Sequence, residues 1–247
     1  MSTLFISDLH LDQSRPNVID FFIKYLSNIE KNITSIYILG DLVEYWVGDD
    51  DPAIGLNKVF ETIHKVSHNT PIYFMQGNRD FMMSEDFCTK YGIKLLNDPT
   101  IINLNSKKIL LMHGDTLCTD DIEYQKYRKL VRSEKWQNEM KTKTLEERLS
   151  IANELRKKSK LETKEKEDQI MDVNQDSVND VIKKYDVDIL IHGHTHRPNI
   201  HQIDIEGKSV QRIVLGDWYK SAYFYIYDNG KNIIHKQNLG IKKDHNS

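Results

Sequence analysis

The stretch Thr3-Leu4-Phe5-Ile6-Ser7-Asp8-Leu9-His10 contains the pattern that decides the fold: a short apolar run that ends abruptly in polar residues. The pattern recurs four times along the chain, as 36–40 before Asp41, 72–77 before Asn78, 109–112 before His113, and 187–191 before His192-Gly193-His194. Continuous apolar runs of this length predict strands that are buried on both faces. We therefore expect five internal strands, each ending in a side chain with hydrogen-bonding or metal-binding capacity.

The segments between these runs predict the fold class. Helical spacing of apolar residues predicts helices over 16–30 and 57–67, and short β-rich runs predict strands at 203–205, 213–215 and 223–227. Alternation of strands and helices indicates an α/β sandwich. We expect one domain over residues 1–247.

One segment differs from the rest of the chain. From Asp121 to Tyr185 there is no Gly or Pro, and Lys, Arg and Glu dominate. Its spacing predicts two or three helices inserted between the fourth and fifth strands. Mixed charge of this kind is typical of solvated helix faces, so composition alone assigns this segment no binding role.

Composition excludes several classes of protein. The chain has 247 residues, with 34 Lys and Arg against 37 Asp and Glu, a formal charge of −3. This balance argues against a protein that coats nucleic acid, and two cysteines do not make a disulfide framework. We expect no targeting segment and no membrane-spanning helix, because a charge at Asp8 interrupts the first apolar run and no run approaches ~20 apolar residues.

The residues that end the five strands predict a metal centre. A single Asp or Asn after a strand is more often a turn or a helix cap, but five such ends in one sheet system indicate a shared site. Their donors are carboxylate and amide oxygens and imidazole nitrogens, without thiolate, which suits Mn, Fe or Zn. The donors are too many for one ion, and two metals ~3.5–4 Å apart form a clamp for displacement at phosphorus.

These residues carry a resemblance. Asp8-x-His10, Gly40-Asp41, Gly77-Asn78, His113 and Gly193-His194-x-His196 resemble the five blocks of the calcineurin-like metallophosphoesterase superfamily, from Thr3 to about Gly216. The resemblance implies two mixed sheets flanked by helices, with two divalent metal ions, for which we expect Mn²⁺. It places one metal on Asp8, His10, Asp41 and His196, and the other on Asp41, Asn78, His113 and His194. His192 matches no ligand position and is interpreted as a packing residue or as one that contacts a ligand without binding the metal itself.

The third block departs from the usual pattern. Most of the superfamily has Gly-Asn-His there, where this chain has Gly77-Asn78-Arg79-Asp80. The family's His is usually assigned to protonating the leaving group, which Arg cannot do because its pKa exceeds ~12. Arg can neutralise charge on a phosphoryl oxygen, so a leaving group stable as an anion, and hence a pyrophosphate substrate, is favoured. The alternative is that Arg79 merely pairs with Asp80 or another carboxylate.

Longer runs narrow the resemblance to one branch. Those around Asp41, Trp46, Arg79, His113 and His194 resemble the UDP-2,3-diacylglucosamine diphosphatase family of lipid A biosynthesis. This implies hydrolysis of the substrate's pyrophosphate bond by metal-bound hydroxide attacking the UMP-side phosphorus, giving UMP and 2,3-diacylglucosamine 1-phosphate, with Arg79 as the catalytic residue.

The same resemblance assigns roles to the inserted helices. They become a cap over about 121–184 that helps to bind the acyl chains, and the residues matched to substrate contacts are Asn78, Arg79, Asp121, Ser159, Thr163, Lys166 and His194. Thr163 stands where relatives often have Asn. Ser159 and Lys166 lie in a run so charged that ordinary surface positions remain open as an alternative.

A substrate with two acyl chains implies contact with a membrane. We expect a cytoplasmic enzyme with weak peripheral attachment to the cytoplasmic face of the inner membrane, helped by basic residues at Lys126, Arg128, Lys129 and Arg132. No nucleic acid and no obligate protein partner are inferred.

Two other functions remain open. A nucleotide or cyclic-nucleotide phosphodiesterase of the same fold is disfavoured by Arg79 and by the long insertion. A non-catalytic scaffold on this fold would be expected to have broken ligand blocks, whereas all the predicted ligands are present.

Overall fold

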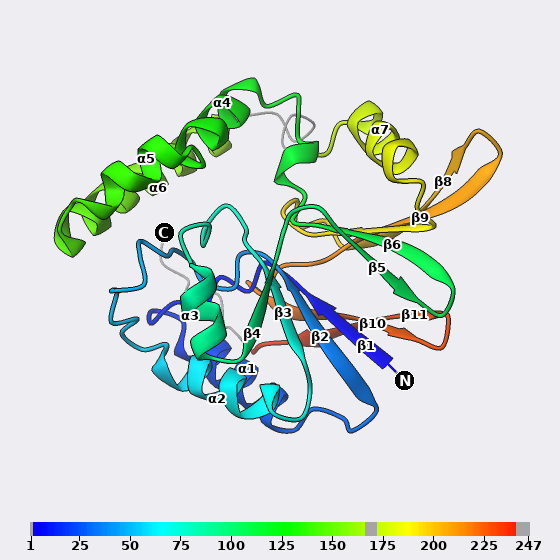
Figure 1. Cartoon of the computed structure of the whole chain (residues 1–247), viewed down its shortest axis with the longest axis horizontal. Helices are drawn as coiled ribbons and strands as arrows, with labels where there is room; N and C mark the ends of the chain where they lie inside the picture. Colours follow the sequence, from blue (N-terminus) through cyan, green and yellow to red (C-terminus); the bar gives the residue numbers. More distant parts are fainter. Residues whose placement is uncertain (1, 166–171, 241–247) are drawn as a thin grey trace.

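The computed structural model describes residues 2–165 and 172–240, which form two facing mixed sheets with helices on their outer sides (Figure 1). The first sheet has the order β11 (Lys231–Asn238), β10 (Ser221–Asp228), β1 (Ser2–Ile6), β2 (Ile33–Leu39), β3 (Ile72–Met75) and β4 (Ile93–Leu96). The second has the order β5 (Thr100–Leu104), β6 (Lys107–Met112), β7 (Ile189–His192), β9 (Lys208–Val214) and β8 (Asn199–Ile205). The expected sandwich of two mixed sheets is confirmed.

The five predicted internal strands are β1, β2 and β3 in the first sheet and β6 and β7 in the second. Within each sheet they run parallel to one another. Parallel neighbours place their carboxyl ends at the same edge, so the polar residues after these strands meet at one edge of the sandwich.

Alternation along the strands builds the layers. In β1, Leu4 and Ile6 face the outer helices α1 (Pro16–Ser27), α2 (Asn57–Ser67) and α3 (Glu85–Lys90), while Phe5 faces the second sheet. On the far side, Leu110 and Leu190 pack against Val178 of α7 (Gln175–Tyr185). Both faces of the central strands are therefore buried, which explains their unbroken apolar sequence.

The inserted segment begins beyond a short 3₁₀ turn, Asp115–Leu117, and forms α4 (Ile122–Val131), α5 (Glu134–Lys141) and α6 (Leu145–Glu165). Figure 1 shows these three helices together, apart from the helices that cover the sheets. The name "cap" denotes α4, α5 and α6.

Arginines fasten the cap to the sandwich. Arg148 of α6 donates to the carbonyl of Val47 at 2.7 Å and forms a bidentate pair with Asp50, and Arg132 donates to the carbonyl of Gly77 at 2.7 Å. Because Gly77 precedes Asn78, the second anchor lies beside the ends of the central strands.

The structure differs from the sequence-based expectation in two respects. The described residues between β6 and β7 form four α-helices rather than two or three, and α7 packs on the second sheet instead of joining the cap. The expectation also omitted β4, β5 and α3, which are elements of four to six residues, and β11, a strand of eight residues.

Candidate metal centre

The backbone is unusual where the central strands end. Asp8, His10, Asp41, His194 and His196 all adopt a positive φ, between 48° and 68°. This left-handed region is sparsely populated by residues other than Gly, though Asn, Asp and His enter it most readily. Five such residues at one sheet edge indicate a backbone bent to aim these side chains inward, as is common at functional sites.

Two glycines allow the strand ends to approach. A Cβ atom on Gly77 would overlap the carboxylate of Asp41, and a Cβ atom on Gly40 would overlap the ring of His113. The absence of a side chain at these two positions therefore lets neighbouring strand ends lie against the site residues. Any larger residue at either position would push the strand ends apart.

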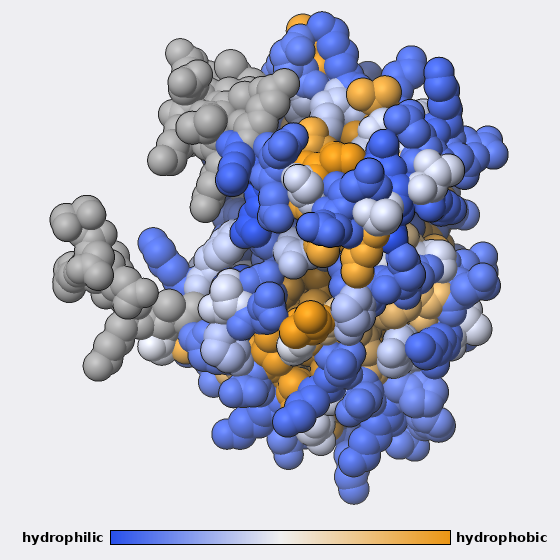
Figure 2. All heavy atoms as spheres, turned by 90° about the vertical axis from the view of Figure 1, so that its left-hand side faces the viewer, coloured by the Kyte–Doolittle hydropathy of each residue, from blue (hydrophilic) through white to orange (hydrophobic). Residues whose placement is uncertain are grey.

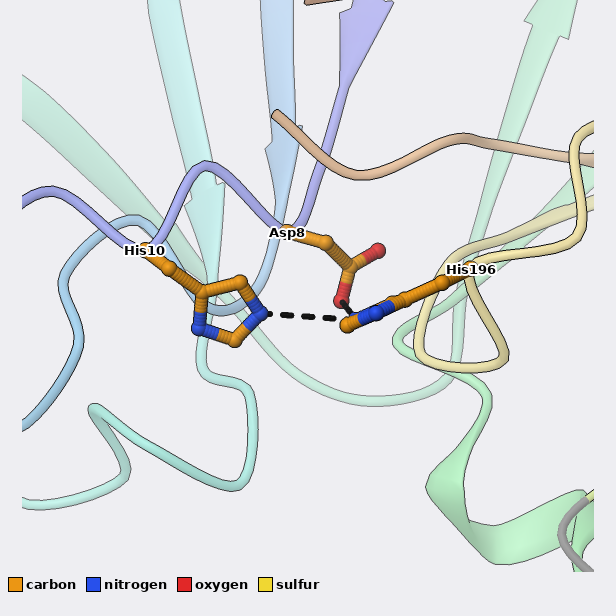
Figure 3. Close-up of side chains that lie close together, drawn as sticks. All are labelled: Asp8, His10 and His196. Atoms are coloured by element: carbon orange, nitrogen blue, oxygen red, sulfur yellow. Dashed lines mark hydrogen bonds and ion pairs between the residues drawn. The ribbon is translucent and has the colours of Figure 1, made fainter. Parts of the chain in front are cut away.

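The first set of predicted ligands forms a compact group (Figure 3). Nε2 of His10 lies 3.4 Å from Nε2 of His196, and Nε2 of His196 lies 3.4 Å from Oδ1 of Asp8. Asp41 joins them, with Oδ2 3.8 Å from Nε2 of His10. Candidate ligand atoms of Asp8, His10 and His196 all lie within 4.8 Å of one another.

The second set lies directly beside the first. Oδ1 of Asn78 is 3.0 Å from Nε2 of His113 and 2.9 Å from Nδ1 of His194. The other oxygen of Asp41, Oδ1, lies 3.8 Å from Nε2 of His113. Asp41 thus presents one oxygen to each set, which is the arrangement that a bridging carboxylate requires.

The surroundings fix the two carboxylates differently. Oδ2 of Asp8 accepts hydrogen bonds from the hydroxyl of Ser7 at 2.5 Å and from the backbone of His194 at 2.9 Å, while Oδ1 is buried and lacks a hydrogen-bond donor among the described residues. Asp41 Oδ1 accepts the backbone N–H of Arg79 at 2.8 Å. A buried carboxylate oxygen without a donor is costly unless a cation meets it, so these residues fit a metal site.

Charge and burial perturb the titration of the site. Burial alone opposes ionisation of Asp8, yet the imidazoles of His196, His113 and His10 hold the pKa of Asp8 well below its usual range. Burial likewise disfavours the charged form of His113, but Asp41, Asp115 and Asp8 raise its pKa to about 9. The centre is a negative field that attracts positive charge, whether a proton or a metal ion.

His192 is separate from these sets. It is completely buried at the end of β7, Nδ1 lies 2.9 Å from the carbonyl of Gly193, and burial lowers its pKa to about 4. A neutral, enclosed imidazole agrees with the packing role expected for it.

Arg79 lies at the mouth of this centre. The carboxylate of Asp80 accepts backbone N–H groups of Gly77 at 2.7 Å and Leu42 at 2.7 Å, so it is engaged in holding the strand ends together. Burial works against the charge of Arg79, but Asp41 and Glu44 raise its pKa. Among the described residues, Nε of Arg79 has no hydrogen-bond acceptor, which leaves the guanidinium available to an anionic ligand.

A cavity of about 650 Å³ opens over the centre and runs beneath the cap. Asn78, Arg79, Asp121 and His194 are among its polar lining residues. Its apolar lining comes from both cap and sandwich: Trp46, Val47, Phe81, Met82, Leu130, Trp136, Met140, Ile151 and Leu155. Figure 2 shows apolar residues in the hollowed middle of one face of the molecule.

The remaining predicted substrate contacts are placed only in part. Asp121 caps α4, where its side chain accepts the backbone N–H of Tyr124 at 3.1 Å. Ser159 and Thr163 belong to α6, but their side chains, like the whole of Lys166, lie outside the described residues.

Sequence reasoning missed several residues that contact the centre. Oε2 of Glu44 lies 3.2 Å from Nδ1 of His10, Oδ2 of Asp217 lies 3.6 Å from Nδ1 of His196, and the ring of Tyr219 stacks on His10 at 5.2 Å. The position of Glu44, three residues beyond Asp41 in a buried stretch, was a usable signal, because a buried Glu requires a partner.

Comparison with known proteins agrees with this geometry. The family model described as "Calcineurin-like phosphoesterase" matches residues 1–198. A UDP-2,3-diacylglucosamine hydrolase of Chromohalobacter salexigens is 43% identical over 219 residues, covering 88% of this chain and 89% of the relative. A UDP-2,3-diacylglucosamine hydrolase of Vibrio parahaemolyticus is 44% identical over 220 residues, covering 89% and 91%. The chain, with its two sheets and its converging Asp, Asn and His side chains, belongs to the calcineurin-like phosphoesterase family.

Proposed function

We propose that this protein hydrolyses the pyrophosphate bond of UDP-2,3-diacylglucosamine, releasing UMP and 2,3-diacylglucosamine 1-phosphate. The cavity carries the proposal, because it joins a cluster of candidate metal ligands to a long apolar wall. A substrate with a charged pyrophosphate and two acyl chains needs both surfaces at once. The relatives named for this activity support the same substrate.

The ligand atoms at the site suggest how two metal ions would be bound. When bound, two divalent metals would supply a Lewis acid and a nucleophile at neutral pH. Asp8, His10, Asp41 and His196 would hold one metal, and Asp41, Asn78, His113 and His194 the other. This mixture of oxygen and imidazole donors suits Mn²⁺, which we propose as the ion.

Arg79 has the role of charge neutralisation in this proposal. Arg79 lines the same cavity as Asn78 and His194, so its guanidinium can donate to a phosphoryl oxygen while the bond to the sugar phosphate breaks. The departing sugar phosphate is stable as an anion and needs no proton. Attack at the UMP-side phosphorus is therefore compatible with a site that has Arg79 where a general acid would stand.

The cap contributes the rest of the substrate contacts. We propose that Asp121, together with Ser159, Thr163 and Lys166 further along the chain, binds the phosphosugar, and that the apolar wall takes the acyl chains. In the family resemblance these roles belong to the same positions, and the described part of the cavity reaches Asp121.

We also propose weak contact with the inner membrane, on its cytoplasmic face. None of the described helices combines the length and the apolar character needed to cross a bilayer. On α4, Ile122 and Leu130 are 62% and 57% exposed, beside the exposed Lys126 and Lys129. Arg128 and Arg132 belong to a different surface, because Arg128 pairs with buried Asp115 at 2.6 Å and Arg132 with the carbonyl of Gly77.

Flotation with anionic liposomes at low salt tests the membrane proposal. We expect part of the protein to float, and the double variant Ile122→Ser, Leu130→Ser to float less. Protein that stays wholly in solution at low salt would refute the contact.

A substrate panel tests the function. Purified protein with Mn²⁺ is offered UDP-2,3-diacylglucosamine, UDP-glucose and bis-p-nitrophenyl phosphate, and UMP or p-nitrophenol is measured. We expect UMP from the diacylated substrate alone at an appreciable rate. Cleavage of only bis-p-nitrophenyl phosphate would favour a general phosphodiesterase, and no turnover of any substrate would favour a non-catalytic scaffold.

A further inference from the structure

Glu44 is a buried carboxylate that joins the candidate metal centre to the cap. It is 5% exposed and comes from the segment after β2, three residues beyond Asp41. One oxygen, Oε2, lies 3.2 Å from Nδ1 of His10, and the other, Oε1, lies 2.8 Å from a guanidinium nitrogen of Arg156 on α6. Glu44 therefore contacts both a predicted metal ligand and the cap.

The position of this contact on the ring of His10 matters. Nε2 of His10 faces His196 and Asp41, whereas Nδ1 faces Glu44. A carboxylate beside Nδ1 favours the tautomer that carries its proton there, which leaves the lone pair on Nε2 for a metal. The present alignment at Nδ1 falls short of a well-formed hydrogen bond, although Oε2 of Glu44 is 3.2 Å away.

A second ring in the set has a similar but looser arrangement. Nδ1 of His196 lies 3.6 Å from Oδ2 of Asp217, and the side chain of His196 is 30% exposed, whereas that of His10 is 2% exposed. Water can therefore replace Asp217 more readily than it can replace Glu44. Glu44 is the stronger constraint of the two.

Arg156 extends the chain of contacts to the cap. Its side chain is 38% exposed and Glu44 is its partner at 2.8 Å, while Arg148, two turns earlier on α6, pairs with Asp50 instead. On α6, therefore, Arg156 has a contact that leads to His10, and Arg148 has one that does not. This difference provides a matched pair of variants.

We propose that Glu44 is a positioning residue of the metal centre, which orients the imidazole of His10 and ties it to the cap through Arg156. The inference rests on the proposed metal-binding role of His10. It predicts that metal affinity and the Glu44–Arg156 ion pair depend on one another, as any coupling between two sites must be reciprocal.

Binding of Mn²⁺ to the metal-stripped full-length protein, measured by calorimetry, tests the proposal without any substrate. Losing a carboxylate that orients a metal-bound His typically weakens affinity about 10–100-fold. We expect Glu44→Ala to weaken one of two Mn²⁺ sites by that factor and to leave the other unchanged. In Glu44→Gln the amide oxygen still accepts from Nδ1–H, so this variant should recover much of the lost affinity. It also allows the measurement if Glu44→Ala fails to fold.

The two arginine variants separate the route through Glu44 from loosening of the cap in general. Arg156→Ala removes a partly exposed ion pair and should weaken the same Mn²⁺ site by roughly two- to fivefold. Arg148→Ala should leave Mn²⁺ affinity unchanged. Equal losses in both arginine variants, or wild-type affinity in both Glu44 variants, would overturn the proposal.

The tautomer of His10 gives an independent measurement. Long-range ¹H–¹⁵N NMR of metal-free protein should show His10 protonated at Nδ1 in the wild type and a mixture of tautomers in Glu44→Ala. An unchanged Nδ1 tautomer in that variant would also contradict the proposal. If two Mn²⁺ ions fail to bind the wild type, the proposed function fails rather than the role of Glu44.

Discussion

At the scale of single residues, the backbone decides which substitutions are informative. Asp41 has φ 53°, in the left-handed region that Asn tolerates better than Ala. Asp41→Ala would therefore mix loss of the carboxylate with backbone strain. Asp41→Asn keeps the size and the hydrogen bond to the N–H of Arg79 while removing the charge that both metal sites would share.

For Asp41→Asn we expect activity to fall by at least ~10³-fold, because a bridging charge stabilises both ions of the clamp. Below pH 9 the metal-free variant should unfold at a lower temperature than the wild type, because the charge of Asp41 helps to hold the proton on His113. Hydrolysis assays and differential scanning calorimetry measure the two quantities. Near-normal activity at saturating Mn²⁺ would show that Asp41 does not bridge.

Arg79 allows a second prediction at this scale. If its guanidinium neutralises charge on the phosphoryl group, Arg79→Ala should cost about 2–4 kcal/mol of transition-state stabilisation, seen as a loss in kcat/KM of roughly 30- to 900-fold. Arg79→Lys, which keeps the charge but not the planar fork, should recover only part of it. Wild-type kinetics in Arg79→Ala, with Mn²⁺ affinity unchanged, would remove Arg79 from the mechanism.

The site was partly predictable at residue scale. Asp8, His10, Asp41, Asn78, His113, His194 and His196 follow from strand ends and family resemblance, and the structure brings all seven together. Glu44 was overlooked, although its place in a buried stretch was a usable signal. Arg156 and Tyr219 did not emerge, since nothing in the sequence tells a side chain that contacts the site from one on a solvated face. That distinction depends on helix rotation and loop path.

At the scale of elements, prediction succeeded where apolar runs were long and buried on both faces. β1, β2 and β6 were found because their sequences have few polar interruptions. β11 was missed because most of its residues are exposed, and it forms one edge of the first sheet. β4 and β5 were missed, since each is an edge strand and is only partly buried. A half-exposed strand of four or five residues has too few positions for its alternation to stand out.

The cap invites a test at this scale. Arg148 is 4% exposed and secures α6 through Val47 and Asp50, although Asp50 itself is largely exposed and water screens that ion pair. The hydrogen bond to the carbonyl of Val47 is the larger contribution, about 1–2 kcal/mol.

We expect Arg148→Ala to raise amide hydrogen exchange in the first half of α6 by about 5–30-fold, the equivalent of 1–2 kcal/mol. Exchange in β1 and β2 should be unaffected and serves as an internal control. Uniformly faster exchange across the sheets would mean that Arg148 supports the whole fold rather than the cap.

At the scale of the whole molecule, the small net charge of −3 conceals an uneven distribution. Buried carboxylates gather at the strand ends, while four arginines of the cap point into the structure: Arg128, Arg132, Arg148 and Arg156. Composition could not reveal this, because it counts charges without placing them. Of these four, Arg156 lines the cavity, as Arg79 does, so a pyrophosphate there would meet both candidate metal ligands and guanidinium groups.

This field predicts how stability depends on pH in the absence of metal. The pKa of His113 is about 9 in the folded chain against 6.5 for an ordinary imidazole, so the folded state retains a proton that the unfolded chain releases. The resulting stabilisation, about 3 kcal/mol, is complete below pH 6.5 and is lost as the pH rises through 9. His196, whose pKa is also raised because Asp8 outweighs burial, acts in the same direction.

Calorimetry in EDTA should therefore show the melting temperature falling between pH 6.5 and 9. His113→Gln, which cannot take up the proton, should show a shallower fall. A wild-type melting temperature that is flat or rises across this window would contradict the charge distribution described for the centre.

Hydrolysis of UDP-2,3-diacylglucosamine in ¹⁸O-labelled water with Mn²⁺ tests the central claim most directly, with mass spectrometry of both products. We predict one ¹⁸O atom in UMP and none in 2,3-diacylglucosamine 1-phosphate, with Asp41→Asn giving neither product. Label in 2,3-diacylglucosamine 1-phosphate would mean that the attack occurs at the sugar-side phosphorus, contrary to the proposal. If the protein cleaves bis-p-nitrophenyl phosphate but leaves UDP-2,3-diacylglucosamine intact, that result would contradict the proposed function itself.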